Sequence, residues 1–320
     1  MLQYLHTHRG IKHTAVPALC CTAKFGGSDK TMNQYTLFTD SATDLSVELI
    51  REMGVEVVPL RFHLGNQEYK NYPDDREMSN KEFYKLLRSG QTATTSQVNQ
   101  ADWMQAFQSA LDQGRDVLCL AFSSGLSGTY QAATLAAQEL APLYPERTIQ
   151  VIDTLQASMG EGLLVYHAAC MKNEGYSLAH VADWVEQNKD KICAWFTVDD
   201  LMFLKRGGRV SGAAAVAGTL LGIKPVLHID LEGHLIPMEK VRGRKASLDA
   251  LVKHFSESNV DLNQQVVFLS HSDCVEDCEY VEHQIASLGV KKIFTSNIGP
   301  VIGAHTGPGT VALFFSGQNR

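Results

Sequence analysis

Two hydroxyl-rich segments carry the first side chains that could do chemistry. Residues 92–97 (TATTSQ) and 123–129 (SSGLSGT) each precede a helical pattern. The first backbone N–H groups of a helix are unpaired and carry partial positive charge, so this arrangement favours a bound anion. We expect a carboxylate or phosphate at residues 123–129. The alternatives are that Ser127 only caps its own helix, and that residues 92–97 are a polar linker.

Arginines and a histidine supply further candidate groups. Arg206 and Arg209 lie in the segment KRGGR at 205–209, and His305 precedes the segment TGPG at 306–309. A guanidinium group matches a carboxylate or phosphate with two parallel hydrogen bonds, and a histidine donates to an anion or transfers protons. A second basic cluster spans residues 242–245. Surface charge and a structural histidine are the alternative interpretations.

A serine hydrolase is the competing functional class. Its nucleophile elbow has the pattern GxSxG, but Ser127 lies in GLSGT, without the last glycine. His305 would be the base, and Asp153 or Asp40 would orient it. An acyl hydrolase or acyltransferase using Ser127 therefore stays as the alternative to a binding protein without catalytic residues.

The sequence carries no strong signal for a metal or a nucleotide cofactor. Its seven cysteines form no CxxC pair, and His271, Cys274 and Cys278 lack metal-ligand spacing. Residues 160–165 (GEGLLV) lack the third glycine of a dinucleotide fingerprint, and no Walker A lysine motif occurs. We therefore expect no metal and no cofactor. An odd cysteine count without a pattern is typical of a reducing cytoplasm.

Composition bounds the class of protein. The 320 residues are 44% hydrophobic and 20% charged, with a net charge of −7, which makes nucleic acid an improbable main partner. No apolar run approaches the roughly 18 residues that span a bilayer. A cytoplasmic protein is expected. Residues 1–31 show weak periodicity, and we expect them to be a non-native or disordered extension whose deletion leaves the melting temperature unchanged.

The elements that must position these side chains alternate between strand and helix. Residues 117–122 form an unbroken apolar run, typical of a strand that helices cover on both faces. Alternation from residue 35 to about 172 predicts a doubly wound, mainly parallel sheet. Ligands bind at the carboxyl ends of such strands. Four polar segments could converge there: 40–44, 92–97, 123–129 and 153–158.

Local signals predict individual boundaries and a second domain. Ser79 opens a capping box, Asn99 is a second helix cap, and Gly65-Asn66 suits a hairpin turn. We expect an N-terminal α/β domain at 32–172 and a C-terminal α+β domain at 173–320, with the ligand between them. The second domain is expected to include an alanine-rich helix that ends near residue 221.

Taken together, the motifs resemble the DegV family of bacterial fatty-acid-binding proteins. They occur in family order between about residues 35 and 310. The matching pieces are Thr39-Asp40-Ser41, Thr95-Ser96-Gln97, the segment 123–130, Asp153-Thr154, Ser158 with Gly160, the segment 205–209, Lys224-Pro225, Arg242-Gly243 and the segment 305–309.

The resemblance implies two α/β domains with a long-chain, palmitate-like fatty acid buried between them. It implies that the hydroxyls of Thr95 and Ser127 hold the carboxylate and that His305 lies near it. Neighbouring residues are added to the expected ligand site: Thr94, Ser96, Ser124 and Gly128. Family members usually have proline after Thr-Ser-Gln, where this chain has Val98.

The resemblance also implies a carrier that is not a catalyst by itself. Better-studied family members present the bound acid to an ATP-dependent kinase subunit related to dihydroxyacetone kinases. That partner forms the acyl phosphate, which feeds phospholipid synthesis. Arg206 and Arg209, with His305, are the residues implied in engaging the partner and in phosphoryl transfer. Transient contact with a membrane surface is compatible with such a role.

Overall fold

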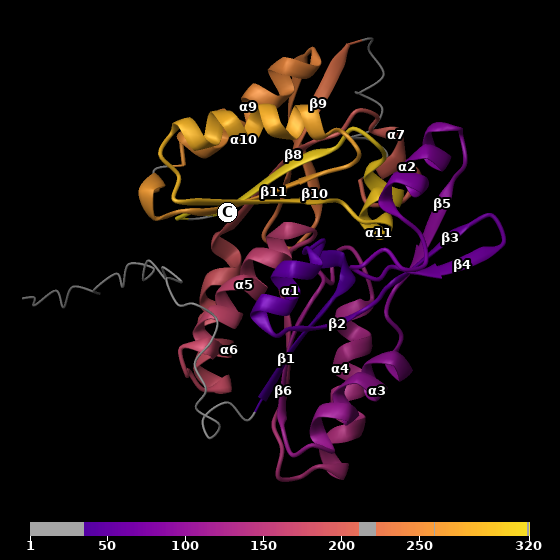
Figure 1. The fold of residues 1–320 in the computed structure, drawn as a ribbon, viewed down its shortest axis with the longest axis vertical. Helices are drawn as coiled ribbons and strands as arrows, with labels where there is room; N and C mark the ends of the chain where they lie inside the picture. The colour runs from indigo at the N-terminus through magenta and orange to yellow at the C-terminus, as the bar shows by residue number, and fades with distance from the viewer. Residues whose placement is uncertain (1–34, 211–221, 259, 319) are drawn as a thin grey trace, which may run out of the picture.

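The first layer of the protein is a parallel sheet. The computed structural model describes residues 35–210, 222–258, 260–318 and 320 (Figure 1). Sheet A contains β1 Tyr35–Asp40, β2 Glu56–Val58, β6 Asp116–Ala121 and β7 Ile149–Asp153. Its order is β2-β1-β6-β7, and every neighbouring pair is parallel. The apolar run predicted at 117–122 is therefore a central strand.

Helices cover both faces of sheet A (Figure 1). On one face lie α3 Gln100–Leu111 and α4 Thr129–Leu140, and on the other lie α5 Met159–Asn173 and α6 Leu178–Asn188, with α1 Val47–Met53 against α5. Residues Val117 to Ala121 of β6 have no exposed surface. This two-sided burial is the reason the strand is apolar throughout instead of alternating, and it confirms the predicted fold class of the first domain.

Sheet C forms the second layer and is mixed. It contains β8 Ile192–Thr197, β9 Ile223–Ile229, β10 Leu235–Arg242, β11 Val266–His271, β12 Lys292–Asn297 and β13 Val311–Ser316, in the order β10-β9-β8-β13-β11-β12. Only β11 and β12 pair in parallel among its described strands. Helices α9 Arg244–Ser256 and α10 Val275–Ser287 cover its outer face, and α5 packs against its inner face.

Alternation along the strands of sheet C separates two cores. In β8, Ala194 and Phe196 face sheet A, whereas Cys193 and Trp195 pack under α9 and α10. Period-two alternation is expected where each face of a sheet meets a different set of neighbours. The inner face of sheet C therefore belongs to a core that continues into the first domain.

A small third sheet corrects one expectation. Sheet B contains β3 Arg61–Leu64, β4 Gln67–Lys70 and β5 Ala93–Ser96, in the order β4-β3-β5. Residues 92–97 are thus mostly strand, and the prediction of a polar linker or pre-helix loop was wrong. Antiparallel pairing, with Thr95 opposite Phe62, orders this stretch. The hairpin between β3 and β4 about Gly65-Asn66 is confirmed.

Three short helices complete the frame of the site. Helix α2 Asn80–Arg88 follows sheet B, α7 Met202–Arg206 follows β8, and α11 Pro300–Thr306 precedes β13. Figure 1 shows α11 beside α2 and sheet B, although these segments are far apart in sequence. Single 3-10 turns lie at Ser41–Thr43, Ala141–Leu143, Lys189–Lys191 and Leu262–Gln264.

Two predicted helix caps are confirmed and one is wrong. The side chains of Ser79 and Asn99 accept bonds from Glu82 N and Asp102 N. Helix α4 instead begins after Gly128, and no side chain caps it, because Ser127 lies one residue too early. The predicted extension at 1–31 and the alanine-rich helix ending near 221 lie outside the described residues. The predicted boundary at 172/173 stays a prediction.

No helix in the described part of the chain is both long enough and apolar enough to span a bilayer.

Candidate ligand site between the sheets

A cavity of about 360 Å³ lies between sheet A, sheet C and α11. Most of its wall is apolar, with contributions from both domains. Its apolar lining includes Leu60, Phe122, Leu126, Phe196, Leu204, Ile229, Leu235, Ile298, Val301, Ile302, Ala312 and Phe314. The inner face of sheet C supplies Phe196, Ala312 and Phe314, because these residues alternate with the outward-facing ones of their strands. Such a cavity suits an extended apolar ligand.

Hydrogen-bond donors gather in one part of this lining. Thr95 comes from β5, Ser127 and Gly128 from the start of α4, Arg209 from the segment after α7, and His305 from the last turn of α11. The unpaired N–H groups at the start of α4 add partial positive charge. This part of the cavity is therefore suited to an anionic group.

His305 joins the two domains at this site. Its Nε2 atom lies 2.7 Å from Thr95 Oγ1, across 210 positions in sequence. Its Nδ1 atom is buried and has no hydrogen-bond partner among the described residues. Burial, and then the charge of Arg209, lower the pKa of His305 to about 4, so the ring is neutral at pH 7 and carries one N–H. His305 lies in the last turn of α11, directly before the glycine-rich segment.

Close backbone approach explains one glycine of the KRGGR segment. A Cβ atom on Gly207 would lie 2.2 Å from His305 Nδ1, so a side chain at this position would displace the imidazole ring. Arg209, two residues on, donates from Nε to Leu126 O at 3.2 Å and from Nη1 to Gly207 O. Arg209 is half-buried, and burial lowers its pKa below the usual value, although a guanidinium stays protonated at neutral pH.

The hydroxyl groups of the site are not saturated by their protein neighbours and can still bond to a ligand. Ser127 Oγ lies 2.9 Å from Thr129 Oγ1 and accepts from Thr129 N at 3.3 Å. Ser96 Oγ lies 2.9 Å from His63 Nε2. A hydroxyl has one donor and two acceptor positions, so each retains capacity beyond these contacts.

A second cavity of about 240 Å³ adjoins the first on its outer side. It shares Thr95, Arg209 and His305 with the larger cavity and adds Thr92, Thr94 and Arg206. The guanidinium carbon of Arg206 lies 4.5 Å from the centre of the Phe203 ring, which also lines the cavity. The donor-rich group of residues thus forms a wall between the inner acyl cavity and an outer cavity that Arg206 and Thr94 also line.

The remaining predicted site residues differ in which cavity they line. Ser96 and Gly128 line the larger cavity, Thr94 and Arg206 line only the outer one, and Ser124 is exposed and lines neither. The segments 92–97, 123–129 and 153–158 do approach one another: the Gln97 side chain lies against Gly128, and Ser124 N donates to Asp153 Oδ1. Residues 40–44 do not line the larger cavity.

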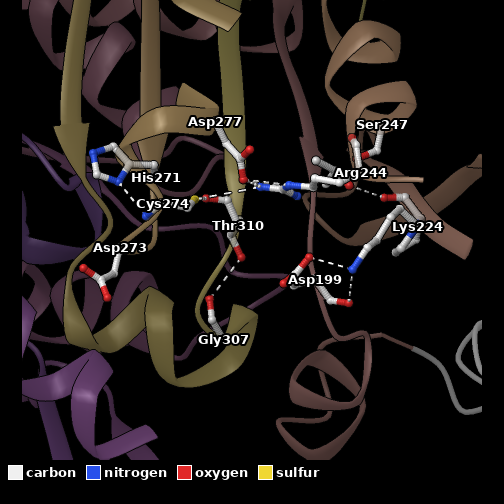
Figure 2. A network of polar contacts seen from close by, with 12 residues as sticks. Asp199, Lys224, Arg244, Ser247, His271, Asp273, Cys274, Asp277, Gly307 and Thr310 are labelled. Carbon is white, nitrogen blue, oxygen red and sulfur yellow. Dashed lines mark hydrogen bonds and ion pairs between the residues drawn. The ribbon is translucent and has the colours of Figure 1, made fainter. Parts of the chain in front are cut away.

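The second basic cluster has a structural role on the far side of sheet C. Figure 2 shows that Arg244 pairs with Asp277 and approaches Cys274, whose thiol donates to Thr310 O at 3.2 Å. Thr310 Oγ1 in turn donates to Gly307 O at 3.2 Å, which ties the turn after α11 to sheet C. Arg244 is therefore held away from the donor-rich wall.

A triad for the hydrolase alternative is not assembled in the described residues. Asp40 Oδ2 accepts from Phe122 N at 2.9 Å, and Asp153 Oδ1 accepts from Ser124 N and Leu155 N, so neither orients His305. His305 pairs with Thr95, and Ser127 pairs with Thr129. Within the described chain no cluster of three or more His, Cys, Asp or Glu is suited to a metal.

Sequence reasoning missed a buried carboxyl cluster beside the cavity. Asp40, Asp44 and Glu161 are buried, and burial raises their pKa values, to about 7 for Asp40, to about 8 for Asp44 and well above 4.5 for Glu161. Thr39 Oγ1 donates to Glu161 Oε1 at 3.0 Å, whereas Glu161 Oε2 has no partner in the part of the chain that the structure describes. The available signal was Glu161 itself, the only acidic residue of the apolar segment 159–171.

Comparison with known proteins decides the family. Residues 34–318 match the family described as "Uncharacterised protein, DegV family". The chain belongs to the DegV family. A DegV domain-containing protein of Clostridium perfringens is 44% identical over 290 residues, which cover 90% of this chain and 99% of that protein.

Solved DegV structures have the same fold. A fatty-acid-binding DegV family protein of Thermus thermophilus matches with a TM-score of 0.81 and 34% identity, over 89% of this chain and 99% of that one. A stearic-acid-binding protein of Eubacterium ventriosum matches with a TM-score of 0.79 and 26% identity, over 89% and 98%. DegV of Bacillus subtilis, described as a fatty acid binding protein, matches with 0.76 and 27%, over 90% and 100%. The two-domain α/β fold of this DegV chain is thereby confirmed.

Proposed function

We propose that this DegV protein binds a long-chain fatty acid, with the carboxylate at the donor-rich wall and the acyl chain in the apolar cavity. The observation that carries the proposal is the division of one cavity into a mainly apolar wall and a group of donors formed by Thr95, Ser127, Arg209 and His305. The fatty acids named for solved relatives have this chemistry.

The position of the carboxyl cluster supports this orientation of the ligand. Ser158 lines the cavity and donates to Asp44 Oδ2 at 2.6 Å, so the carboxyl cluster adjoins one part of the wall. An acid head group beside other carboxyls would be repelled or would have to bind a proton. The head group is favoured at Arg209, and the tail is favoured against the apolar residues.

Burial of the chain supplies most of the affinity. Each buried CH₂ contributes about 0.8 kcal/mol, so roughly 14 methylenes of a palmitate-like acid contribute about 11 kcal/mol before the costs of association. A hydrogen bond to a charged group adds about 1.5–3 kcal/mol. The donors therefore orient the ligand more than they hold it.

Native mass spectrometry of the purified protein tests the proposal, and a co-purified fatty acid is expected. Thr95→Ala combined with Ser127→Ala should weaken binding about 100-fold and leave the fold intact, since two bonds of about 1.5 kcal/mol are lost. Thr94→Ala combined with Ser124→Ala is the matched control, because neither residue lines the larger cavity. Equal acyl content in the two double variants would contradict the assigned carboxylate site.

We further propose that the bound acid is presented to an ATP-dependent kinase subunit that forms an acyl phosphate for phospholipid synthesis. The outer cavity supports this role, because it reaches the donor-rich wall from outside the acyl cavity and contains Arg206 and Arg209. Guanidinium groups suit a phosphoryl group in transfer. The protein itself is then a carrier, not a catalyst.

Arg209→Ala tests the presentation step. Because the acyl chain supplies most of the affinity, the variant should still co-purify with lipid, although its affinity falls with the loss of one head-group donor, and it should lose most acyl phosphate formation in a kinase-coupled assay. Arg242→Ala, an exposed basic substitution outside both cavities, should leave both properties unchanged. Full activity of Arg209→Ala would remove this residue from the proposal. Ser127-dependent hydrolysis of acyl esters by the pure protein would favour the hydrolase alternative.

A further inference from the structure

Helix α11 carries His305, yet several of its contacts come from the first domain. Its chain neighbours β12 and β13 belong to sheet C, whereas α11 packs against α2, β3 and β5 of the first domain (Figure 1). At its start, Gly299 N donates to Asp44 Oδ1 at 2.8 Å, and Tyr84 Oη donates to Ile298 O at 2.7 Å. Two side chains of the first domain thus hold the residues that begin α11.

Asp44 is itself fixed by its surroundings. It is 7% exposed and has a φ of 52°, a left-handed conformation that few residues other than glycine adopt. Its Oδ2 atom accepts from Ser158 Oγ at 2.6 Å, and Ser158 Oγ lies 3.0 Å from Ser270 Oγ on sheet C. One oxygen of the Asp44 carboxyl group therefore accepts from Gly299 at the start of α11, and the other accepts from Ser158, which precedes α5.

The approach of α11 to Asp44 depends on a missing side chain. A Cβ atom on Gly299 would lie 3.1 Å from Asp44 Oδ1 and 3.2 Å from both amide atoms of Asn71. These distances are tighter than ordinary van der Waals contacts. Asn71 is also buried and donates to Ser41, so the Gly299 backbone is enclosed by first-domain polar groups.

Asp44, with Ser41, Asn71 and Gly299, lines a separate cavity of about 270 Å³. Asp44 does not line the acyl cavity, and no ion pair of the described residues includes it. A buried carboxyl without a cation is costly, and a buried N–H without an acceptor is costly too. The bond to Gly299 N offsets both costs at the one place where α11 begins.

We propose that Asp44 is a positioning residue for the carboxylate site. By accepting the Gly299 N–H it fixes the start of α11, and α11 then holds His305 against Thr95 and Arg209. Tyr84, which donates to Ile298 O, is the second tether. The inference rests on the proposed function, because it names a residue that controls the head-group site without touching the ligand.

Two measurements on Asp44→Ala test this role. Fatty-acid affinity should fall about tenfold, because His305 is no longer held against Thr95. In ligand-free protein, the pKa of His305, followed by NMR of its ring, should rise from about 4 towards 6.5 as the ring gains solvent. The groups that face this ring are Thr95, Gly207 and Arg209. Tyr84→Phe should shift both quantities in the same direction by a smaller amount, about threefold in affinity.

Conservative and local controls separate positioning from general destabilisation. Asp44→Asn keeps an oxygen for Gly299 N and should retain affinity within about threefold. Ser46→Ala removes the cap of α1 in the same loop, where Ser46 Oγ accepts from Leu49 N, and should change neither affinity nor the His305 pKa. In a His305→Ala background, Asp44→Ala should cause no further loss of affinity.

Three results would overturn the inference: an unchanged His305 pKa in both Asp44→Ala and Tyr84→Phe, an equal affinity loss from Asp44→Ala with and without His305, or a His305 pKa shift in Ser46→Ala as large as that in Asp44→Ala. The pKa readout needs no ligand. Absence of fatty acid binding in the wild type would therefore refute the proposed function while leaving the positioning test intact.

Discussion

Two polar regions lie between the sheets of this protein, and they have opposite chemistry. The region around Thr95, Arg209 and His305 presents donors to an open cavity, and its nearest formal charge is positive. The region around Asp44 and Glu161 contains buried carboxyl groups that accept bonds from the protein's own donors, and a separate cavity of about 270 Å³ adjoins it at Asp44.

The difference between the two regions is one of hydrogen-bonding capacity. The first region keeps capacity for a ligand, whereas the carboxyls of the second accept bonds from the protein itself. Donors that face a cavity have unused capacity, which an anion can satisfy. The carboxyls instead use backbone N–H and hydroxyl donors, as Asp40 does with Phe122 N and Ala42 N. Burial disfavours the charged form of these carboxyls and raises their pKa values, so part of the cluster holds protons at neutral pH. The bound protons remove the need for a paired cation.

A carboxylate placed in the donor-rich region should make it as unfavourable for an anionic head group as the carboxyl cluster is. Ser127→Asp puts a negative charge where the ligand head group is proposed. Two charges about 4 Å apart repel by about 4 kcal/mol at an effective dielectric constant of about 20. We expect affinity for a long-chain fatty acid, measured by displacement of a fluorescent analogue, to fall at least 100-fold.

The fold should survive this substitution, because an aspartate also accepts from Thr129 N near the start of α4. Ser127→Asn is the neutral control of similar size and should cost less than tenfold. Equal affinities of the Asp and Asn variants would mean that the head group lies elsewhere.

Removing a proton-holding group from the carboxyl cluster should change the dependence of stability on pH. A carboxyl whose pKa is raised by folding stabilises the protein fully below the unfolded pKa, and that contribution is lost as pH rises to the folded pKa. Glu161, with its pKa well above 4.5, should contribute a slope on the order of 1.4 kcal/mol per pH unit in this window. Glu161→Gln should lack this slope.

Urea unfolding of both proteins between about pH 5 and 9 would measure the effect as a difference between their two stability curves. Buried histidines oppose the carboxyls at lower pH, because His167, His228 and His305 have pKa values lowered to about 4 and add stability as pH rises to about 6.5. Above pH 7 that contribution is complete. Parallel stability curves for wild type and Glu161→Gln would show that Glu161 does not titrate differently in the folded protein.

A third contact between the domains is exposed and should have the smallest effect. Arg88 of α2 pairs with the side chain of Asp273 and donates to Asp273 O at 2.9 Å, with the two side chains 46% and 40% exposed. Exposed ion pairs contribute up to about 1 kcal/mol and are screened by salt. Arg88→Ala should lower the free energy of unfolding by less than about 1 kcal/mol.

Arg76→Ala is the matched control, since Arg76 and Asp74 form an exposed pair within the first domain. Both variants should retain fatty acid, and at about 1 M salt the difference from wild type should largely disappear. Loss of ligand from Arg88→Ala alone would show that the exposed contact matters as much as the buried ones.

Much of the fold follows from chemistry that acts over a few residues. The apolar strand ending at Ala121, the caps at Ser79 and Asn99, and the turn at Gly65-Asn66 each depend on neighbours close in sequence. Their patterns were therefore sufficient to predict parallel α/β architecture and the hydroxyl groups near the carboxyl ends of the strands. The family resemblance added the identity of Thr95, Ser127 and His305 as a group.

Packing between distant segments decided the rest. Thr95 is part of a strand because β3 pairs with it, and His305 is held in place because first-domain groups bond to the start of α11. Glu161 is tolerated in the interior because Thr39 donates to it and burial raises its pKa. Short-range patterns report backbone preference and amphipathic period, whereas these outcomes depend on contacts between residues more than 30 positions apart. Burial and electrostatic environment exist only once such contacts form, so they belong to the folded protein and not to any segment of it.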